Sequence, residues 1–498
     1  MAELSYQIVV GLEVHVQLLT KSKLFCGCST KFGLPPNSAT CPVCLGLPGV
    51  LPVMNRTAYE MALKAALALN CQIARFTKWD RKNYYYPDLP KNYQISQYDL
   101  PISHDGWLEI NAAADPKKDY VPKRIGIIRA HLEEDAGKSL HDESGHGGVS
   151  RVDLNRTGTP LLEIVSRPEI SSGEEAVAYL QELRLMLREL GVSDCEMQEG
   201  SLRCDANVNV HFAENGQTIA TPLVEVKNLN SIRAVERAIK YEASRQFHAY
   251  HDPNDRDSYQ KKFGEVSKAT AGWLDERGVT RVQRRKEEAS DYRYFPEPDL
   301  VPVEVDDAWL ARVRQDMGEL PAAQRQRLQT QYGLSNYDAN VLTSQGRATV
   351  AYFEDTAVLC GDAKAASNWI TNQVLATLNQ RKQTIGQFVL KSATLAELIL
   401  QVKAKGLNNQ RARDVYQKMV ETGVSAGQAI AELGIREISE DDLRAIVRKG
   451  IAGNPKAVAD FKKGNARAIE RIKGLVMKET KGMAKMDVVQ KLLDEELA

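Results

Sequence analysis

The chain has 498 residues, and its 65 basic and 65 acidic side chains give a formal net charge of zero. This length accommodates about two to four domains, and the neutral total means that only local charge can indicate a nucleic-acid partner. The longest apolar runs, such as residues 65–69, are far too short to cross a bilayer. The first residues lack a basic stretch followed by an apolar one, so we expect no secretory signal, no membrane partner and a cytoplasmic location.

The first 300 residues have the pattern of short strands, loops and a few helices. Strands are expected near residues 6–18, 107–112, 123–135, 149–154, 161–166, 196–211 and 219–227, and helices over 55–70, 172–190 and 231–247. Because the strands come in runs instead of alternating regularly with helices, the pattern favours an α+β fold with a largely antiparallel sheet.

The remainder of the chain is expected to be almost entirely helical. Candidate helices are 306–330, 336–358, 363–378, 394–404, 408–421, 438–448, 454–463, 465–479 and 484–496. We therefore predict three domains: residues 1–300 as an α+β domain, 301–405 as a helical domain, and 406–498 as a helical tail domain.

Residues 11–18 alternate strictly between apolar and polar side chains, which is typical of a half-buried strand. Glu13 and His15 then lie on one face, about 7 Å apart along the strand. A carboxylate and an imidazole in this position can be two ligands of a hard divalent cation. An ordinary solvated strand face remains the alternative for these two residues alone.

The same acidic pattern recurs in four more predicted strands. These strands present His131, Glu133 and Asp135; Glu163; Arg203, Asp205, Asn207 and Asn209; and Glu225 and Lys227. If these strands share one sheet face, their carboxylates repel one another, and bound divalent cations usually neutralise such repulsion. Oxygen-rich ligands with an imidazole suit Mg²⁺ or Mn²⁺ better than zinc. For any single carboxylate, a surface position or a structural ion pair remains an alternative.

The basic residues near these strands indicate a phosphate ligand. Enzymes generally hold Mg²⁺ with few carboxylates plus substrate phosphates, and Arg203, Lys227 and Arg293 are candidates to contact those phosphates. The pattern points to phosphoryl transfer from a nucleotide. Neither a Walker A sequence nor a Gly-x-Gly-x-x-Gly follows any predicted strand, so the nucleotide site has another architecture.

Four of the eight cysteines, Cys26, Cys28, Cys41 and Cys44, form two close pairs separated by a loop. This spacing is typical of four thiolates around a tetrahedral structural zinc. Free thiols or a degenerate site are the alternatives.

Residues 83–99 read as a long loop rich in tyrosine and amide side chains. Such a loop can stack on the bases of a single-stranded RNA end. It can equally be a packed loop that covers a sheet edge.

The C-terminal tail is locally basic. Residues 451–485 carry nine Lys and Arg side chains against three acidic ones. Such a patch is typical of phosphate-backbone binding, and a solvated helical face is the alternative. The candidate residues for this contact are Lys462, Lys463, Arg467, Arg471 and Lys473, and the family resemblance described next implies tRNA as the nucleic acid.

Five blocks together resemble a known family, the B subunits of the aspartyl/glutamyl-tRNA(Asn/Gln) amidotransferases. They are VGLEVH at 10–15, YYYPDLPKNYQISQ at 84–97, HLEEDAGK at 131–138, DLNRTGTPLLEIV at 153–165 and DYRYFPEPD at 291–299. The resemblance runs essentially end to end. It implies an antiparallel cradle related to glutamine synthetase and the guanido kinases, and a tail domain that meets the body of the tRNA.

The resemblance also implies a reaction. ATP phosphorylates the side-chain carboxylate of Glu or Asp wrongly attached to tRNA(Gln) or tRNA(Asn), and ammonia displaces the phosphate. On this basis Glu13, His15, Glu133 and Glu163 are the leading catalytic Mg²⁺ ligands, followed by Asp205 and Glu225. The four cysteines match a zinc motif found in some members.

The chain contains nothing that resembles an ammonia-generating centre. The family implies two partner chains, a separate amidase-type glutaminase and a small third chain, which complete a heterotrimer. A non-catalytic tRNA-binding scaffold with structural carboxylates is the alternative role.

Overall fold

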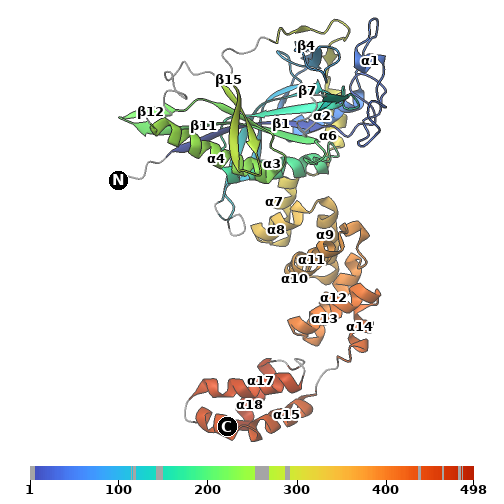
Figure 1. Cartoon of the computed structure of the whole chain (residues 1–498). Helices are drawn as coiled ribbons and strands as arrows, with labels where there is room; N and C mark the ends of the chain where they lie inside the picture. The colour runs from blue at the N-terminus through green and yellow to red at the C-terminus, as the bar shows by residue number, and fades with distance from the viewer. Residues whose placement is uncertain are drawn as a thin grey trace. The chain divides into compact units, whose positions relative to one another are not determined.

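The computed structural model describes residues 6–113, 115, 119–141, 150–252, 268–285, 292–435, 439–462, 465–480, 484 and 486–497. The chain divides into two compact units, Met1–Gln324 and Arg325–Ala498 (Figure 1). The domain limits expected at residues 300 and 405 remain predictions. Lys463 lies outside the described residues, as do the side chains of Lys462 and Arg467.

The first unit is built on a ten-stranded sheet. Its strands in spatial order are β15 (Val279–Arg285), β14 (Ala269–Leu274), β13 (Val224–Lys227), β11 (Leu202–Glu214), β1 (Gln7–Gln17), β10 (Pro160–Ser166), β7 (Pro122–Glu134), β6 (Ser103–Asn111) and β2 (Gln72–Ile73), with β12 (Gln217–Ala220) paired to β11. In the described part of the sheet every pairing is antiparallel except β13 with β14. The predicted α+β class is confirmed.

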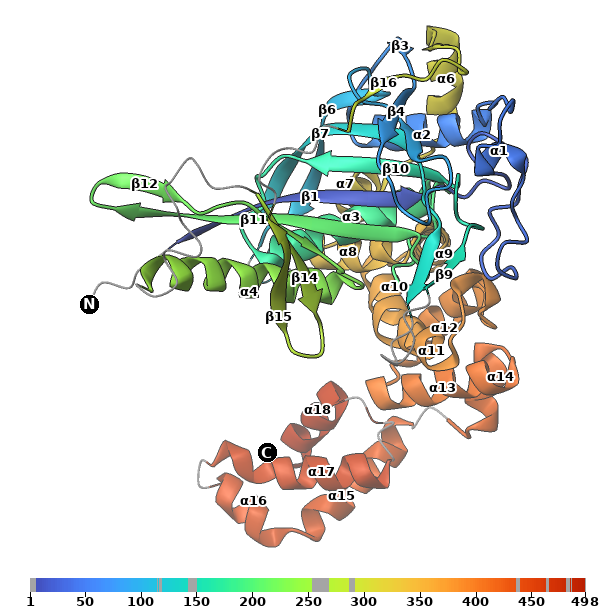
Figure 2. The ribbon, with the colours of Figure 1, turned by 45° about the horizontal axis from the view of Figure 1, so that its top comes forward.

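The alternation in the sequence places the apolar side chains of β1 in the core. Leu12, Val14 and Val16 are almost fully buried, since successive side chains of a strand point to opposite faces. The helices α2 (Arg56–Ala68), α3 (Gly173–Glu189) and α4 (Ile232–His251) belong to the same core. Figures 1 and 2 show α3 and α4 together against one side of the sheet. The opposite face therefore carries the polar side chains.

All three helices begin as the sequence predicts. The side chains of Asn55, Ser172 and Ser231 each accept a backbone N–H from the first turn of the helix that follows. Such caps satisfy donors that the helix itself leaves unpaired.

A small three-stranded sheet packs near the polar face. It contains β16 (Phe295–Pro296), β4 (Asp80–Asn83) and β5 (Tyr93–Ser96), and β5 packs against β7. The expected loop at residues 83–99 is therefore partly a strand, because β5 pairs in register with β4. The other short elements of this unit are α1 (Pro42–Leu45), β3 (Phe76–Thr77), β8 (Lys138–His141), β9 (Ser150–Asp153), β17 (Val303–Glu304) and α6 (Asp307–Gln315).

The rest of the described chain is helical. Its helices are α7 (Pro321–Tyr332), α8 (Asn336–Ser344), α9 (Arg347–Cys360), α10 (Ala363–Trp369), η1 (Ile370–Val374), α11 (Leu375–Arg381), η2 (Ile385–Gln387), α12 (Ser392–Lys405), α13 (Asn409–Thr422), α14 (Ala426–Glu432), α15 (Glu440–Ala452), α16 (Pro455–Lys462), η3 (Ala466–Ile469), α17 (Glu470–Glu479) and α18 (Met486–Leu497). Two long predicted helices are each split in two, at Gly318 and Gly346, which adopt φ of 65° and 93°. Such backbone angles interrupt a helix.

Two separate apolar clusters stabilise these helices. One spans residues 328–435, and the other spans residues 443–497. Among the described residues, none of the helices combines the length and apolar character needed to cross a membrane.

Candidate metal centres

The sheet register brings the predicted acidic strands together on one face. His131 pairs with Glu163, Glu163 with His15, and His15 with Arg203, so four neighbouring strands contribute one row of polar side chains. Directly paired residues of antiparallel strands project to the same face, with their Cβ atoms about 5 Å apart. Glu13, paired with Asp205, begins the next row.

Five of these side chains form two groups that share one carboxylate. Glu13, His15 and Glu163 make the first group; His131, Glu133 and Glu163 make the second. Within each group the nearest ligand atoms all lie within 4.8 Å of one another. His15 Nε2 is 3.5 Å from Glu13 Oε1 and 3.4 Å from Glu163 Oε2, and His131 Nε2 is 3.6 Å from Glu163 Oε2. We call these five residues the carboxylate cluster.

Burial and mutual charge set the protonation of this cluster. Burial opposes a charge on His15, yet the carboxylates of Glu163, Glu133 and Glu13 raise its pKa to about 9. Burial lowers the pKa of His131 to about 4, and it raises the pKa of Glu133 to about 7. The pKa of Glu163 stays below its ordinary value despite burial, because His131 and His15 flank it. The cluster thus holds a neutral imidazole beside ionised carboxylate at neutral pH.

The positive side chains nearest this cluster, Arg203 and Lys82, both interact with carboxylates of the polar face. Arg203 Nη2 lies 2.8 Å from Asp135 Oδ1, and Gln17 donates to the other oxygen of the same carboxylate at 2.8 Å. The ammonium of Lys82 stays charged despite burial, because Glu133 and Glu163 raise its pKa above the ordinary value. These contacts offset part of the negative charge on the polar face.

Three other predicted residues form a separate ion-pair network. Lys227 Nζ lies 2.5 Å from Asp205 Oδ2 and 3.1 Å from Glu225 Oε1. Neither carboxylate belongs to the two close groups. Arg293 has an exposed side chain and donates to the hydroxyl of Tyr85 at 3.3 Å. The assignments of Asp205 and Glu225 to Mg²⁺, and of Lys227 and Arg293 to phosphate, remain predictions.

Two residues of this face were not among the predicted ligands or phosphate contacts. His131 lies two residues before Glu133 in the same strand. The alternation of β7 therefore already indicated that the two side chains share one face. Lys82 stands in a short strand whose position over the sheet depends on tertiary packing. No local pattern could have placed its ammonium beside carboxylates from β7 and β10.

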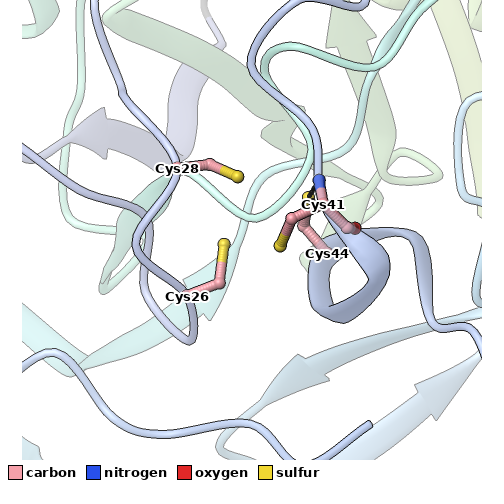
Figure 3. A group of neighbouring side chains, drawn as sticks. All are labelled: Cys26, Cys28, Cys41 and Cys44. Atoms are coloured by element: carbon pink, nitrogen blue, oxygen red, sulfur yellow. Dashed lines mark hydrogen bonds between the residues drawn. The ribbon is translucent and has the colours of Figure 1, made fainter.

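The four predicted zinc ligands converge in the structure. Figure 3 shows the sulfur atoms of Cys26 and Cys28, from one loop, facing those of Cys41 and Cys44 at the start of α1. All four sulfurs lie within 4.8 Å of one another. Sulfurs about 3.8 Å apart are what a tetrahedral site with Zn–S bonds of about 2.3 Å requires. We call these four residues the cysteine cluster.

Cys44 is the most enclosed of these four thiols, and its pKa is lowered. A hydrogen bond from the Cys26 thiol lowers the pKa of Cys44 to about 4, against the opposing effect of burial. The backbone N–H of Cys41 also donates to this sulfur at 3.2 Å. Thiolate is the form that binds metals.

The predicted tRNA-binding residues differ in their surroundings. Arg471 is exposed on α17, whereas the ammonium of Lys473 lies 2.6 Å from Glu470 and is largely enclosed. The assignment of the tail to RNA binding remains a prediction.

The chain matches known proteins along its whole length. A family model described as the GatB/GatE catalytic domain matches residues 8–311, and one described as the GatB domain matches residues 351–497. The B subunit of the aspartyl/glutamyl-tRNA(Asn/Gln) amidotransferase of Moorella thermoacetica is 50% identical over 495 residues, covering 99% of this chain and 100% of that protein. The chain belongs to the family of amidotransferase B subunits.

A second relative agrees with this membership. The protein of the same name from Rhodopirellula baltica is 49% identical over 486 residues, covering 98% of this chain and 96% of that protein. The predicted family is confirmed. The role of the chain is that of an amidotransferase B subunit, and its reaction class is that of the glutamine-dependent ligases.

Proposed function

We propose that this chain carries the site at which ATP activates the side-chain carboxylate of a misacylated Glu-tRNA(Gln) or Asp-tRNA(Asn), and at which ammonia converts it to the amide. The observation that carries the proposal is the carboxylate cluster, in which two ligand groups share Glu163. Buried carboxylates that serve only the structure are usually neutralised by ion pairs with cationic side chains. In this cluster three carboxylates and two imidazoles converge instead.

The residues present fit Mg²⁺. The set is rich in oxygen ligands, which hard cations prefer. Buried carboxylates at this separation repel one another unless a cation intervenes. The Nε2 atoms of His15 and His131 both approach Glu163 Oε2, at 3.4 Å and 3.6 Å. Glu13, His15, His131, Glu133 and Glu163 would hold the ion or ions.

When bound, Mg²⁺ would neutralise charge on the transferring phosphate. The chain's own residues then have separate tasks. Lys82 keeps a positive charge beside Glu133 and Glu163, where it can attract an anionic substrate group. Arg203 is held by Asp135 at the end of the same row, in position for a phosphate oxygen. The polar face of the sheet thus offers preorganised charge to the reacting groups.

The wider architecture of the proposal follows the family resemblance. The first unit would be the catalytic cradle, of the type found in glutamine synthetase and the guanido kinases. The amidase-type partner chain would supply ammonia, and the small third chain would complete a heterotrimer in the cytoplasm. Enclosure of the site matters, because an acyl phosphate exposed to water hydrolyses.

The cysteine cluster fits a structural zinc. It offers four sulfur ligands and no open position for substrate, as structural zinc sites do. Its task would be to fix the loops on both sides of α1.

The basic tail would bind the phosphate backbone of the tRNA. Replacing Lys462, Lys463 and Arg467 together by Ala should weaken tRNA binding and reduce the slope of log affinity against log salt by about three. Filter binding across a salt series measures both quantities. Identical curves for the variant and the parent chain would refute this assignment.

The catalytic proposal is tested with Glu13→Ala and His15→Ala in the assembled complex. Both should abolish ATP cleavage that depends on Glu-tRNA, and both should leave glutamine hydrolysis by the amidase-type partner intact. Glu109→Ala is the matched control, because Glu109 lies on β6 of the same sheet and contacts Tyr120 and Arg124 instead. Undiminished amide formation by both cluster variants would instead favour the non-catalytic tRNA-binding scaffold.

A further inference from the structure

Lys23 is a fully buried lysine beside the cysteine cluster. Its Nζ atom lies 2.8 Å from the carbonyl oxygen of Ala39, 3.5 Å from that of Leu154 and 3.6 Å from the sulfur of Cys44. In the described part of the chain, Lys23 takes part in no ion pair with a carboxylate. The proposed catalytic and tRNA sites do not use it.

Among the described residues, the cysteine cluster is the nearest source of compensating charge for this amine. A buried ammonium is costly unless negative charge lies nearby, and two carbonyl dipoles carry no net charge. The carboxylates of Glu134 and Asp299 line the same pocket, but Glu134 forms an ion pair with Lys91, and Asp299 forms one with Arg81. Four thiolates around one Zn²⁺ leave a net charge of about minus two. The cysteine cluster with its metal therefore supplies the negative charge that the Lys23 ammonium needs. In turn, the ammonium neutralises part of the net negative charge of the cluster.

We propose that Lys23 is the counter-ion of the zinc centre: its ammonium donates to the Cys44 thiolate and so retains the metal. The inference rests on the zinc site proposed above. A hydrogen bond with a charged partner is stronger than one between neutral groups, and removing it leaves the thiolate charge uncompensated in a buried place. Lys23 is thus a positioning residue that acts through Cys44.

The same lysine also connects two segments that are distant in sequence. Ala39 precedes the second cysteine pair, and its N–H donates to the side chain of Asn155 at 2.7 Å. Leu154 and Asn155 begin the turn in which Arg156 reaches Asp135 at 3.5 Å. The carbonyl contacts hold the ammonium at the point where this turn meets the cysteine loops.

The test compares Lys23→Met, which removes the charge and the donors, with Lys23→Gln, which keeps amide donors for the two carbonyls. Lys21→Met is the matched control, because Lys21 is exposed two residues away. Zinc affinity of the full chain is measured by competition with a chromophoric chelator. Both Lys23 variants should bind zinc about ten- to hundredfold more weakly, and the control should match the parent chain. Parent-like zinc affinity in Lys23→Gln would overturn the proposal, because hydrogen bonds to the two carbonyls, without a positive charge, would then be enough to retain the metal.

A second readout reports on the sulfur itself. With Co²⁺ in place of zinc, the thiolate-to-metal charge-transfer band should move to longer wavelength in both Lys23 variants, because the sulfur becomes a better electron donor. An unshifted band would overturn the role of Lys23 even if folding stability changed. A parent chain that binds no zinc would overturn the zinc site itself, whereas zinc binding that is indifferent to Lys23 would overturn only the counter-ion.

Discussion

The two candidate metal centres draw their ligands from very different distances along the chain. The cysteine cluster comes from one segment of 19 residues, between Cys26 and Cys44. The carboxylate cluster needs β1, β7 and β10, whose ligands lie between residues 13 and 163. The first is defined by local turns, and the second by the register of a sheet.

This difference has an energetic consequence. Loops around α1 can rearrange when a ligand is lost, so damage to the cysteine cluster should leave the paired strands of the sheet in place. The carboxylate cluster stands on paired strands whose opposite faces form the core, and its side chains cannot separate without breaking the sheet. Its charges must therefore be compensated in place, by Lys82, by His15 and by bound cations.

The largest effect is expected for Glu163→Gln. Because Glu163 belongs to both ligand groups, this change should reduce Mn²⁺ binding at both, whereas Glu13→Gln should reduce it at one. Amide formation should fall by about a thousandfold or more. Titration of the metal-free chain with Mn²⁺, followed by electron paramagnetic resonance, measures the stoichiometry. Equal losses in the two variants would show that the groups do not share this ligand.

An intermediate effect is expected for Glu133→Gln on the pH dependence of stability. In the folded, metal-free chain the carboxyl pKa is raised from 4.5 to about 7 by burial. The unfolded chain therefore loses this proton at lower pH, and the free energy of unfolding falls as pH rises between these two values. The variant should lack this decline in the free energy of unfolding, which amounts to about 3 kcal/mol.

Urea unfolding at a series of pH values without Mg²⁺ measures this decline. Glu109→Gln, which alters a carboxyl on the same sheet outside the cluster, should retain it. Parallel profiles for the parent chain and Glu133→Gln would contradict the prediction.

The smallest effect on catalysis is expected for Cys28→Ser. Loss of one thiolate should release zinc and lower the midpoint of thermal unfolding of the first unit, because metal binding contributes to folding. Amide formation should change by less than about threefold, since structural zinc sites carry no open coordination position.

Metal analysis, calorimetry and the amidation assay together test this expectation. Cys360→Ser, which alters a buried cysteine outside the cluster, should retain zinc. A loss of activity as large as that of Glu163→Gln would show that the comparison between a local and a sheet-wide centre is wrong.

The sequence by itself determined the local features. Periodicity predicted β1, β7, β10 and β11, helix signals predicted the ranges of α2, α3 and α4, and the spacing of Cys26, Cys28, Cys41 and Cys44 predicted their convergence. These features depend on side-chain alternation, on hydrogen bonds within one turn, or on a short segment. Each is therefore readable without knowledge of the fold.

Only the tertiary structure decided which distant side chains meet. The order of strands in the sheet placed Glu163 between His15 and His131, and packing of the small sheet brought Lys82 to the same carboxylates. Burial then separated the pKa values of two histidines that the sequence presents alike, at about 9 for His15 and about 4 for His131. Strand pairing and desolvation arise from contacts between residues that are distant in sequence, so a local sequence pattern cannot predict them.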